Sequence, residues 1–343
     1  MPDFARKLVL WQRRHGRHGL PWQGTRDPYR FWLSEIMLQQ TQVAAVVPYY
    51  ERFLARFPDI AALARASQEE VLRLWSGLGY YARGRNLLLA AREVARQGKF
   101  PDTREEILEL PGIGPSTAAA IAAFAFGRRA AILDGNVKRV LARCFGIEGD
   151  KPQWDLAQKL LPANGIETYT QALMDLGATV CTRANPACER CPVARDCVAR
   201  RDGRIEELPA ARKRKPLPTR KATWLVLLHQ GSVLLERRPG AGIWGGLWVF
   251  PELPEGKGAT AEKGRVFFRT NFSCEVSESL RLPSIEHGFT HFKLRVQPFR
   301  CTVRKILPRT EAPGRIWLDV DDAIRAAVPA PVKNLLLELS GRK

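Results

Sequence analysis

The chain has 343 residues, 45% of them hydrophobic, which is typical of two globular domains and excludes a disordered polypeptide. It carries 54 Lys and Arg against 35 Asp and Glu, a formal net charge of +19, so we expect a polyanionic partner. No apolar run reaches the roughly 18 residues of a membrane span and no signal peptide precedes the first helix, so we expect a cytoplasmic protein without membrane contact.

The first candidate site residue lies in an apolar helical pattern near the N-terminus. Asp27 is suited to cap this helix and Pro28 to open it, and the pattern continues to about Val43. Phe31 and other apolar residues surround one acid, Glu35. A carboxyl in such surroundings is poorly solvated, which favours the protonated form that a general acid needs. The alternative is a structural Glu that leaves the buried face or pairs with an Arg.

Helical patterns with short breaks continue to Gly98, with no strand-like alternation, so this half is predicted to be all-α. A glycine turn within it carries the aromatic pair Tyr80 and Tyr81, flanked by Arg83 and Arg85. Aromatic side chains beside phosphate-seeking arginines suit insertion into a base stack. Packing of both tyrosines in the core is the alternative.

A helix–hairpin–helix pattern runs from Leu110 onward. Gly112 and Gly114 leave backbone amides uncovered at a helix start, which Ser116 or Thr117 is predicted to cap. Amides at a helix N-terminus bind anions, and in this basic chain we expect a nucleic-acid phosphate. The alternative is an ordinary turn between two core helices.

An acid follows the hairpin. Asp134 precedes Gly135 and Asn136, as the N-cap of the next helix would. Capping is a complete structural explanation of Asp134. A carboxylate beside a phosphate-binding hairpin is also placed to oppose a developing sugar cation, and the two roles are compatible.

Four of the seven cysteines lie close together. Cys181, Cys188, Cys191 and Cys197 have the spacing Cys-x6-Cys-x2-Cys-x5-Cys, whereas the other three are scattered. This distribution predicts one metal centre and excludes a disulfide framework. Four thiolates suit either zinc or a [4Fe-4S] cluster.

The character of the sequence changes after the cysteine loop. Residues 200–221 are basic, contain three prolines and have no periodicity, which predicts an interdomain linker. Strand patterns follow, among them 223–229, 232–238 and 291–303, and a short helix closes the chain. The C-terminal domain is therefore predicted to be α+β.

Together these features resemble the adenine DNA glycosylases, the MutY family within the endonuclease III superfamily of helix–hairpin–helix enzymes. The resemblance covers essentially the whole chain. The motifs that carry it are LPW at Leu20, WLSEIMLQQTQV around Glu35, GLGYYARGRN around Tyr80, LPGIGPSTA at Leu110, ILDGNVKRVLAR around Asp134, the cysteine loop, and the C-terminal WGGLWVFP and FTHF.

The resemblance implies a base-excision repair enzyme that removes adenine mispaired with 8-oxoguanine or guanine from double-stranded DNA, acting as a monomer at the bacterial nucleoid. Glu35 is implied as the general acid, Asp134 as the carboxylate that stabilises the oxocarbenium ion, and Asn136 as their support. The cysteine loop is implied to hold a [4Fe-4S] cluster.

The resemblance also implies the DNA contacts. Gln40 and Tyr80 are implied to fill or wedge the gap left by the flipped base. The remaining DNA-binding residues are Gly112, Gly114, Ser116 and Lys138. Endonuclease III-like enzymes that also cut the strand carry a nucleophilic lysine where this chain has Ser116, so we predict a glycosylase without strand cutting.

The C-terminal domain resembles the Nudix-like module with which the family reads 8-oxoguanine, through Phe289, Thr290 and His291. Gly246 and Glu252 match the start of a Nudix box, but its Arg-Glu-x-x-Glu-Glu stretch is absent around residues 260–265, so pyrophosphate hydrolysis is not expected. The implied domains are an iron–sulfur subdomain (1–28 and 135–200), a six-helix barrel (29–134), the basic linker (201–221) and the Nudix-like domain (222–343).

Two other functions fit parts of the pattern. One is an endonuclease III-like glycosylase that also cuts the strand, which Ser116 and the C-terminal domain disfavour. The other is a non-catalytic DNA-binding protein, which the presence of both Glu35 and Asp134 disfavours. Replacing Glu35 by Gln tests the second alternative. A non-catalytic DNA-binding protein would keep its function, whereas a glycosylase would lose turnover and still bind DNA.

Overall fold

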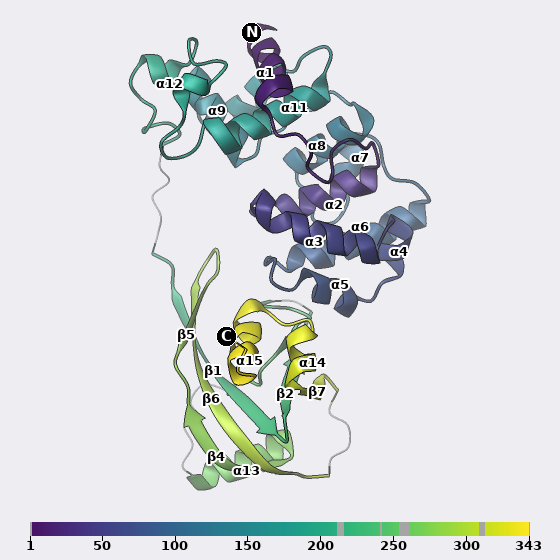
Figure 1. Cartoon of the computed structure of the whole chain (residues 1–343), viewed down its shortest axis with the longest axis vertical. Coiled ribbons are helices and arrows are strands. Elements are labelled where there is room, and N and C mark those ends of the chain that lie inside the picture. The colour runs from purple at the N-terminus through teal and green to yellow at the C-terminus, as the bar shows by residue number, and fades with distance from the viewer. Residues whose placement is uncertain (1, 211–215, 241, 254–260, 309–312, 343) are drawn as a thin grey trace. The chain divides into compact units, whose positions relative to one another are not determined.

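The computed structural model describes residues 2–210, 216–240, 242–253, 261–308 and 313–342. Its backbone contacts divide the chain into two compact units. The first unit comprises Met1–Ala66 and Asn86–Lys213 and is helical, whereas the second comprises Ser67–Arg85 and Arg214–Lys343 and contains the sheet (Figure 1). No helix in the described part of the chain is long and apolar enough to cross a membrane.

The first unit is built from short helices, as the sequence predicts. They are α1 (Pro2–His15), α2 (Pro28–Leu38), α3 (Val43–Arg56), α4 (Ile60–Arg65), α6 (Ala82–Gln97, which begins in the second unit), α7 (Arg104–Leu108), α8 (Pro115–Phe126), α9 (Gly135–Phe145), α10 (Asp150–Lys159), α11 (Ile166–Asp175) and α12 (Val198–Arg201). A π-helix spans Leu176–Val180 and a 3-10 helix spans Cys188–Arg190.

Helix α2 starts where the capping residues predict, but it ends earlier than predicted. Asp27 accepts a hydrogen bond from the Tyr29 amide and Pro28 opens the helix, both as predicted. The helix ends at Leu38 rather than near Val43, because Gln40 adopts a left-handed backbone with φ of 57°. The sequence analysis missed this break, since the apolar pattern continues through it.

The predicted cap of α8 was wrong. Gly114 is the N-cap and Pro115 occupies the first turn, with no side-chain cap from Ser116 or Thr117. Proline is favoured at the first helical position, where its missing N–H leaves no intrahelical bond unmade, so the helix starts one residue before the hydroxyls.

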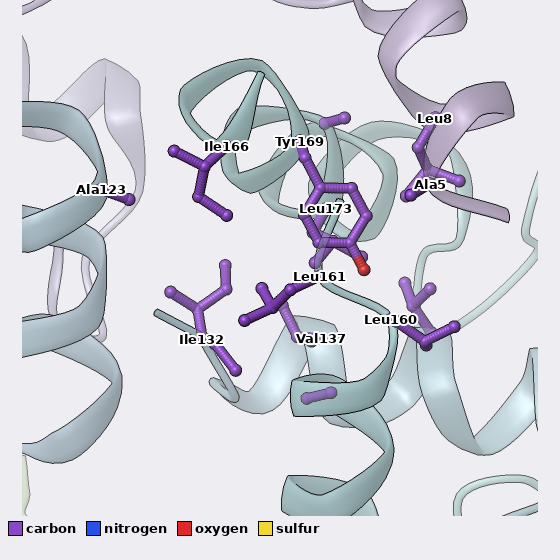
Figure 2. Packing of buried hydrophobic residues seen from close by; sticks show 14 of the residues in the cluster. Ala5, Leu8, Ala123, Ile132, Val137, Leu160, Leu161, Ile166, Tyr169 and Leu173 are labelled. Carbon is purple, nitrogen blue, oxygen red and sulfur yellow. The ribbon is translucent and has the colours of Figure 1, made fainter. Parts of the chain in front are cut away.

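An apolar cluster of the first unit packs α1, α8, α9 and α11 together. Figure 2 shows Tyr169 and Leu173 of α11 directed toward Leu161 and Val137. Helix α8 is buried along nearly its whole length, and its alanines let neighbouring helices approach closely. Ile132 and Val137, which bracket Asp134 in the chain, both point into this cluster (Figure 2). The core thus anchors the segment that carries the second candidate acid.

Seven strands of the described chain form one mixed sheet in the second unit. They are β1 (Thr219–His229), β2 (Ser232–Arg237), β3 (Trp248–Val249), β4 (Cys274–Arg281), β5 (Ile285–Gly288), β6 (Lys293–Ile306) and β7 (Arg315–Asp319). The order is β3-β2-β1-β6-β4, with β5 paired to β6 and β7 paired to β2. Strands β1 and β6 run parallel, and the other pairs are antiparallel.

Helices complete the second unit: α5 (Gln68–Trp75), α13 (Ala261–Phe272), α14 (Val320–Arg325) and α15 (Ala330–Leu339). Helix α13 packs beside β4, and α14 packs against α15 (Figure 1). Burial along β6 alternates, then shifts phase after Pro298, as predicted from its sequence. The fold class, a helical half followed by an α+β domain, is confirmed.

Candidate active site and cysteine cavity

Glu35 lies on α2 between two buried residues, one polar and one apolar. The flanking Ser34 and Ile36 are 0% and 3% exposed, and Glu35 itself is half-buried. It makes no side-chain hydrogen bond to any residue that the structure describes. Burial, and secondarily the negative charge of Asp134, raises the pKa of Glu35 to about 8. Glu35 is therefore mostly protonated near neutral pH, as a general acid must be.

Asp134 caps α9, as predicted. Its Oδ1 accepts hydrogen bonds from the amides of Asn136 and Val137, both at 2.8 Å. Its Oδ2 makes no hydrogen bond within the described ranges. The helix N-terminus favours a negative charge at this carboxyl group. Because the charge of Asp134 acts on Glu35, the structure brings the two predicted acids into one electrostatic environment.

Helix α8 is joined to both acid-bearing segments. The Leu133 amide donates to Ser116 Oγ at 3.0 Å, directly before Asp134 in the chain. Gln39 Nε2 donates to Thr117 Oγ1 at 3.4 Å, one turn after Glu35. The two hydroxyls that were expected to cap α8 instead tie it to the two halves of the candidate site.

A glycine turn leads into α8 at the predicted hairpin. Gly112 has φ of 80°, and a Cβ there would meet Asn86 Cβ at 2.7 Å, so only glycine fits. Gly114, at the N-cap of α8, has no atom of the described residues within 4 Å of an added Cβ, which leaves space beside the helix N-terminus. Lys138, on the first turn of α9, forms an ion pair with Asp150.

A network of hydrogen bonds connects the start of α9 to the cysteine loop. Arg139 donates to Asn136 Oδ1 at 2.9 Å and to the Gly177 carbonyl at 2.6 Å through Nη2. Its Nε donates to the Cys181 carbonyl at 2.7 Å. A Cβ on Gly177 would meet Asn136 Cβ at 2.7 Å, so the π-helix and α9 are in close backbone contact.

The four predicted metal ligands line one cavity. Cys181, Cys188, Cys191 and Cys197 are half-buried around it, together with Cys144, Arg143 and Arg200. In the described ranges no three His, Cys, Asp or Glu side chains converge closely enough to hold a single metal ion. The donor set fits a [4Fe-4S] cluster chemically: four thiols face a shared space, and cations beside them offset thiolate charge.

Arg143 holds the cysteine loop from inside. Its side chain is 4% exposed, and it donates to the carbonyls of Leu208 (2.8 Å), Thr182 (2.7 Å) and Arg183 (3.0 Å). Its Nη1 also lies 3.6 Å from Cys181 Sγ. A buried guanidinium with this many backbone acceptors fixes the path of the loop.

The two candidate DNA-inserting residues share an unusual backbone. Gln40 and Tyr80 have φ of 57° and 48°, which is uncommon for residues with a side chain, and both are exposed. Tyr81, by contrast, is 8% exposed. The aromatic pair therefore divides into one exposed residue, Tyr80, and one core residue, Tyr81, and the insertion of Tyr80 into a base stack stays a prediction.

The candidate base-reading residues lie at a hairpin tip. The Phe289 amide donates to the Phe292 carbonyl at 2.9 Å, which closes a turn with Thr290 and His291 at its centre. Thr290 and His291 are exposed, whereas the Phe289 ring stacks on Phe292 with centroids 4.5 Å apart.

The Nudix-box match is partly described. Glu252 pairs with Arg238 at 3.0 Å. Gly246 adopts φ of 77°. The stretch around residues 260–265, where the acidic half of the box is missing from the sequence, lies outside the described side chains.

The sequence analysis did not single out three residues that line the cysteine cavity or make buried hydrogen bonds. Cys144 was expected to be unrelated to the metal centre, yet it lines the same cavity, and its hydrogen bond lowers the pKa of Cys197 to about 6. Asp175 is fully buried and accepts from the Arg17 amide and Nε at 2.8 and 2.7 Å. Arg143 is the third. Most of their partners are 38 or more positions away, and no local pattern marks them.

Two family models match the chain. Residues 33–163 match the HhH-GPD superfamily of base excision DNA repair proteins, and residues 223–338 match the NUDIX domain. The two matches correspond to the helical and the sheet-containing parts of the sequence.

Curated relatives extend the similarity over nearly the full length. An adenine DNA glycosylase of Buchnera aphidicola is 33% identical over 98% of this chain and 96% of its own. The adenine DNA glycosylase of Rattus norvegicus is 34% identical over 97% of this chain and 77% of its own. Among solved structures, a thermostable thymine-DNA glycosylase is 30% identical, covering 58% of this chain and 96% of its own, with a TM-score of 0.54.

Proposed function

Because the chain belongs to the adenine DNA glycosylase family, and is thus a DNA glycosylase that hydrolyses N-glycosyl bonds, we propose that it removes adenine mispaired with 8-oxoguanine or guanine. The observation that carries the proposal is the pair of acids in contrasting surroundings. Glu35 is held protonated, and Asp134 is held by backbone amides. This division of roles is the one that glycosidic bond cleavage requires.

Glu35 is the proton donor in this proposal. Adenine departs readily only when a ring nitrogen is protonated as the bond to the sugar breaks. With a pKa of about 8, Glu35 holds a proton at neutral pH and loses it when it acts as the acid. The resulting carboxylate then activates the water that attacks the sugar.

Asp134 stabilises the charge that develops on the sugar. Departure of the base leaves positive charge across C1′ and the ring oxygen, and a carboxylate fixed nearby lowers the energy of that state. The two amide bonds to Oδ1 hold the group in place before the reaction, and Oδ2 is available to face the cation. Asn136, restrained by Arg139, supports the same turn.

The adenine must leave the duplex before either acid can reach it. We assign the filling of the gap to Gln40 and Tyr80, whose exposed side chains project from strained turns. The amides at Gly112 and Gly114, together with Ser116 of α8 and Lys138 of α9, would hold the phosphates beside the flipped nucleotide. DNA would have to compete with Asp150 for Lys138.

Cys181, Cys188, Cys191 and Cys197 would hold a [4Fe-4S] cluster. When bound, the cluster joins four points of the loop through metal–thiolate bonds and so stabilises its fold. The chain's own contribution is Arg143, which fixes the backbone of the loop, and Arg139, which connects the loop to Asn136.

The enzyme would cleave the base without cutting the strand. Ser116 stands where strand-cutting relatives of the superfamily use a lysine, and a hydroxyl cannot form the required Schiff base. Its Oγ is already engaged by the Leu133 amide. Reading of the opposite base is assigned to the turn formed by Phe289, Thr290 and His291.

Single-turnover release of adenine from a duplex with one adenine opposite 8-oxoguanine tests the proposal. Strand breaks that appear only after alkali, and that E35Q abolishes while still binding the duplex, are the expected result. Breaks without alkali would instead favour the strand-cutting alternative. Absence of release by the wild-type protein would overturn the proposed substrate and favour a binding protein.

A further inference from the structure

Trp244 occupies a strained position that the proposed chemistry does not use. It is the one tryptophan of the described residues with a left-handed backbone, at φ of 54°, and its side chain is only 7% exposed. Bulky residues rarely adopt this conformation unless surrounding contacts hold them there. The question is therefore what the Trp244 side chain packs against.

The Trp244 ring packs against the β5–β6 hairpin beside its turn. Its centroid lies 5.6 Å from the Phe289 ring and 5.8 Å from the His287 ring. On the other side it lies 5.8 Å from Trp224 of β1, a fully buried core residue. Trp244 thus connects the core of the sheet to the residues that precede the turn.

The hairpin needs such support, because β5 pairs only with β6 within the described sheet. Its four residues have backbone hydrogen bonds on one side alone, and short edge strands are weakly held. Side-chain packing must therefore fix the turn. Phe289 provides it by contacting Trp244, His287 (4.8 Å) and Phe292 (4.5 Å), directly before the exposed Thr290 and His291.

We propose that Trp244 is a positioning residue that fixes the Thr290–His291 turn and thereby sets the preference for 8-oxoguanine over guanine opposite the adenine. The inference rests on the proposed function, since it assigns the base reading to that turn. Trp244 acts through Phe289 and need not touch DNA.

The test compares the full-length variants W244A and W244F with W317A, all in an E35Q background that does not turn over. Trp317 is the control tryptophan, because its partly buried ring belongs to the same sheet but packs near His229 rather than against Phe289 and His287. Dissociation constants are measured for duplexes with adenine opposite 8-oxoguanine and opposite guanine. Hydrogen exchange of the peptide around Phe289 is followed in parallel.

We expect W244A to reduce the preference for 8-oxoguanine about fivefold to tenfold, the effect of losing aromatic contacts at the turn. Exchange at the Phe289 amide should quicken. W244F should restore the preference to within about twofold, because a smaller ring still contacts Phe289. W317A should leave both readouts at the values of the E35Q parent. If W244A does not fold, W244L takes its place.

The outcomes separate the two proposals. An E35Q parent with no preference for 8-oxoguanine overturns the proposed base reading and this inference together. A parent with a preference that W244A retains overturns this inference alone. Equal loss of preference in W244A and W317A also overturns it, because the effect would then be general destabilisation.

Discussion

The helical residues before Lys213 and the sheet domain after it bury different kinds of side chains. All buried polar or charged residues that the structure describes precede residue 214, with Arg143 and Asp175 as the charged examples discussed above. The described part of the sheet domain buries only apolar and aromatic side chains and keeps its charges at the surface. Burying polar groups is unfavourable unless they are hydrogen-bonded.

The difference indicates that the two parts of the chain have different tasks. In the helical part, buried polar groups fix the loop that lines the cysteine cavity, and burial on α2 raises the pKa of the acid that would protonate adenine. In the sheet domain, an apolar core holds a surface turn in place. Catalysis requires charged groups that are shielded from water. Recognition of a base requires side chains that are exposed and held rigid.

The largest effect should come from neutralising Asp134. Asparagine caps helices as well as aspartate does, so D134N should retain the fold while removing the charge that opposes the sugar cation. We expect adenine release about 10³-fold slower in single-turnover assays, with duplex affinity retained.

D319N in the sheet domain is the matched control for Asp134. Asp319 caps α14 through the Asp321 amide at 2.8 Å, and its replacement should leave the rate within about twofold. Equal losses in the two variants would contradict the comparison.

Removing Arg143 should give the next largest effect, on stability. R143A leaves one buried and two partly buried carbonyls without their donor, and we expect a loss of about 3 kcal/mol in the free energy of unfolding. We also expect less iron bound per chain, measured together with the melting temperature.

R238A provides the contrast for Arg143. Arg238 pairs with Glu252 at a partly exposed site, and breaking that pair should cost about 0–1 kcal/mol. A larger loss of unfolding free energy in R238A than in R143A would contradict the distinction between a buried and a surface arginine.

The pH dependence of adenine release follows from Glu35. Burial raises the pKa of Glu35 to about 8, so its acid form is present below that pH and is lost above it. The single-turnover rate should fall about tenfold per pH unit above pH 8. Duplex binding, measured at the same ionic strength, should change far less. A rate that is flat to pH 9.5 would exclude Glu35 as the proton donor.

The smallest effect is expected at His287 in the sheet domain. Burial lowers the pKa of His287 below its ordinary value of 6.5, so the unfolded chain takes up this proton at a higher pH than the folded chain. Stability from this group is therefore full above the ordinary pKa and falls as the pH drops through it. Thermal melts from pH 8 to 5.5 should show a shallower slope for H287Q, and an unchanged slope would contradict the assignment.

The features that depend on neighbours in the chain could be predicted from the amino-acid sequence. Caps at Asp27 and Asp134, the turn at Gly112, and the alternation in β6 are local, because capping and periodicity involve residues only a few positions apart. The family and the fold class followed from such motifs. The roles assigned to the site residues remain predictions.

Tertiary structure alone decided which distant residues meet. It placed Cys144 in the cavity of the four cysteines, joined Ser116 to the segment before Asp134, and packed Trp244 against Phe289. It also exposed Tyr80 while burying Tyr81. Burial shifts a pKa, and packing strains a backbone, only when residues far apart in the sequence come together and exclude water. No local sequence pattern encodes that exclusion.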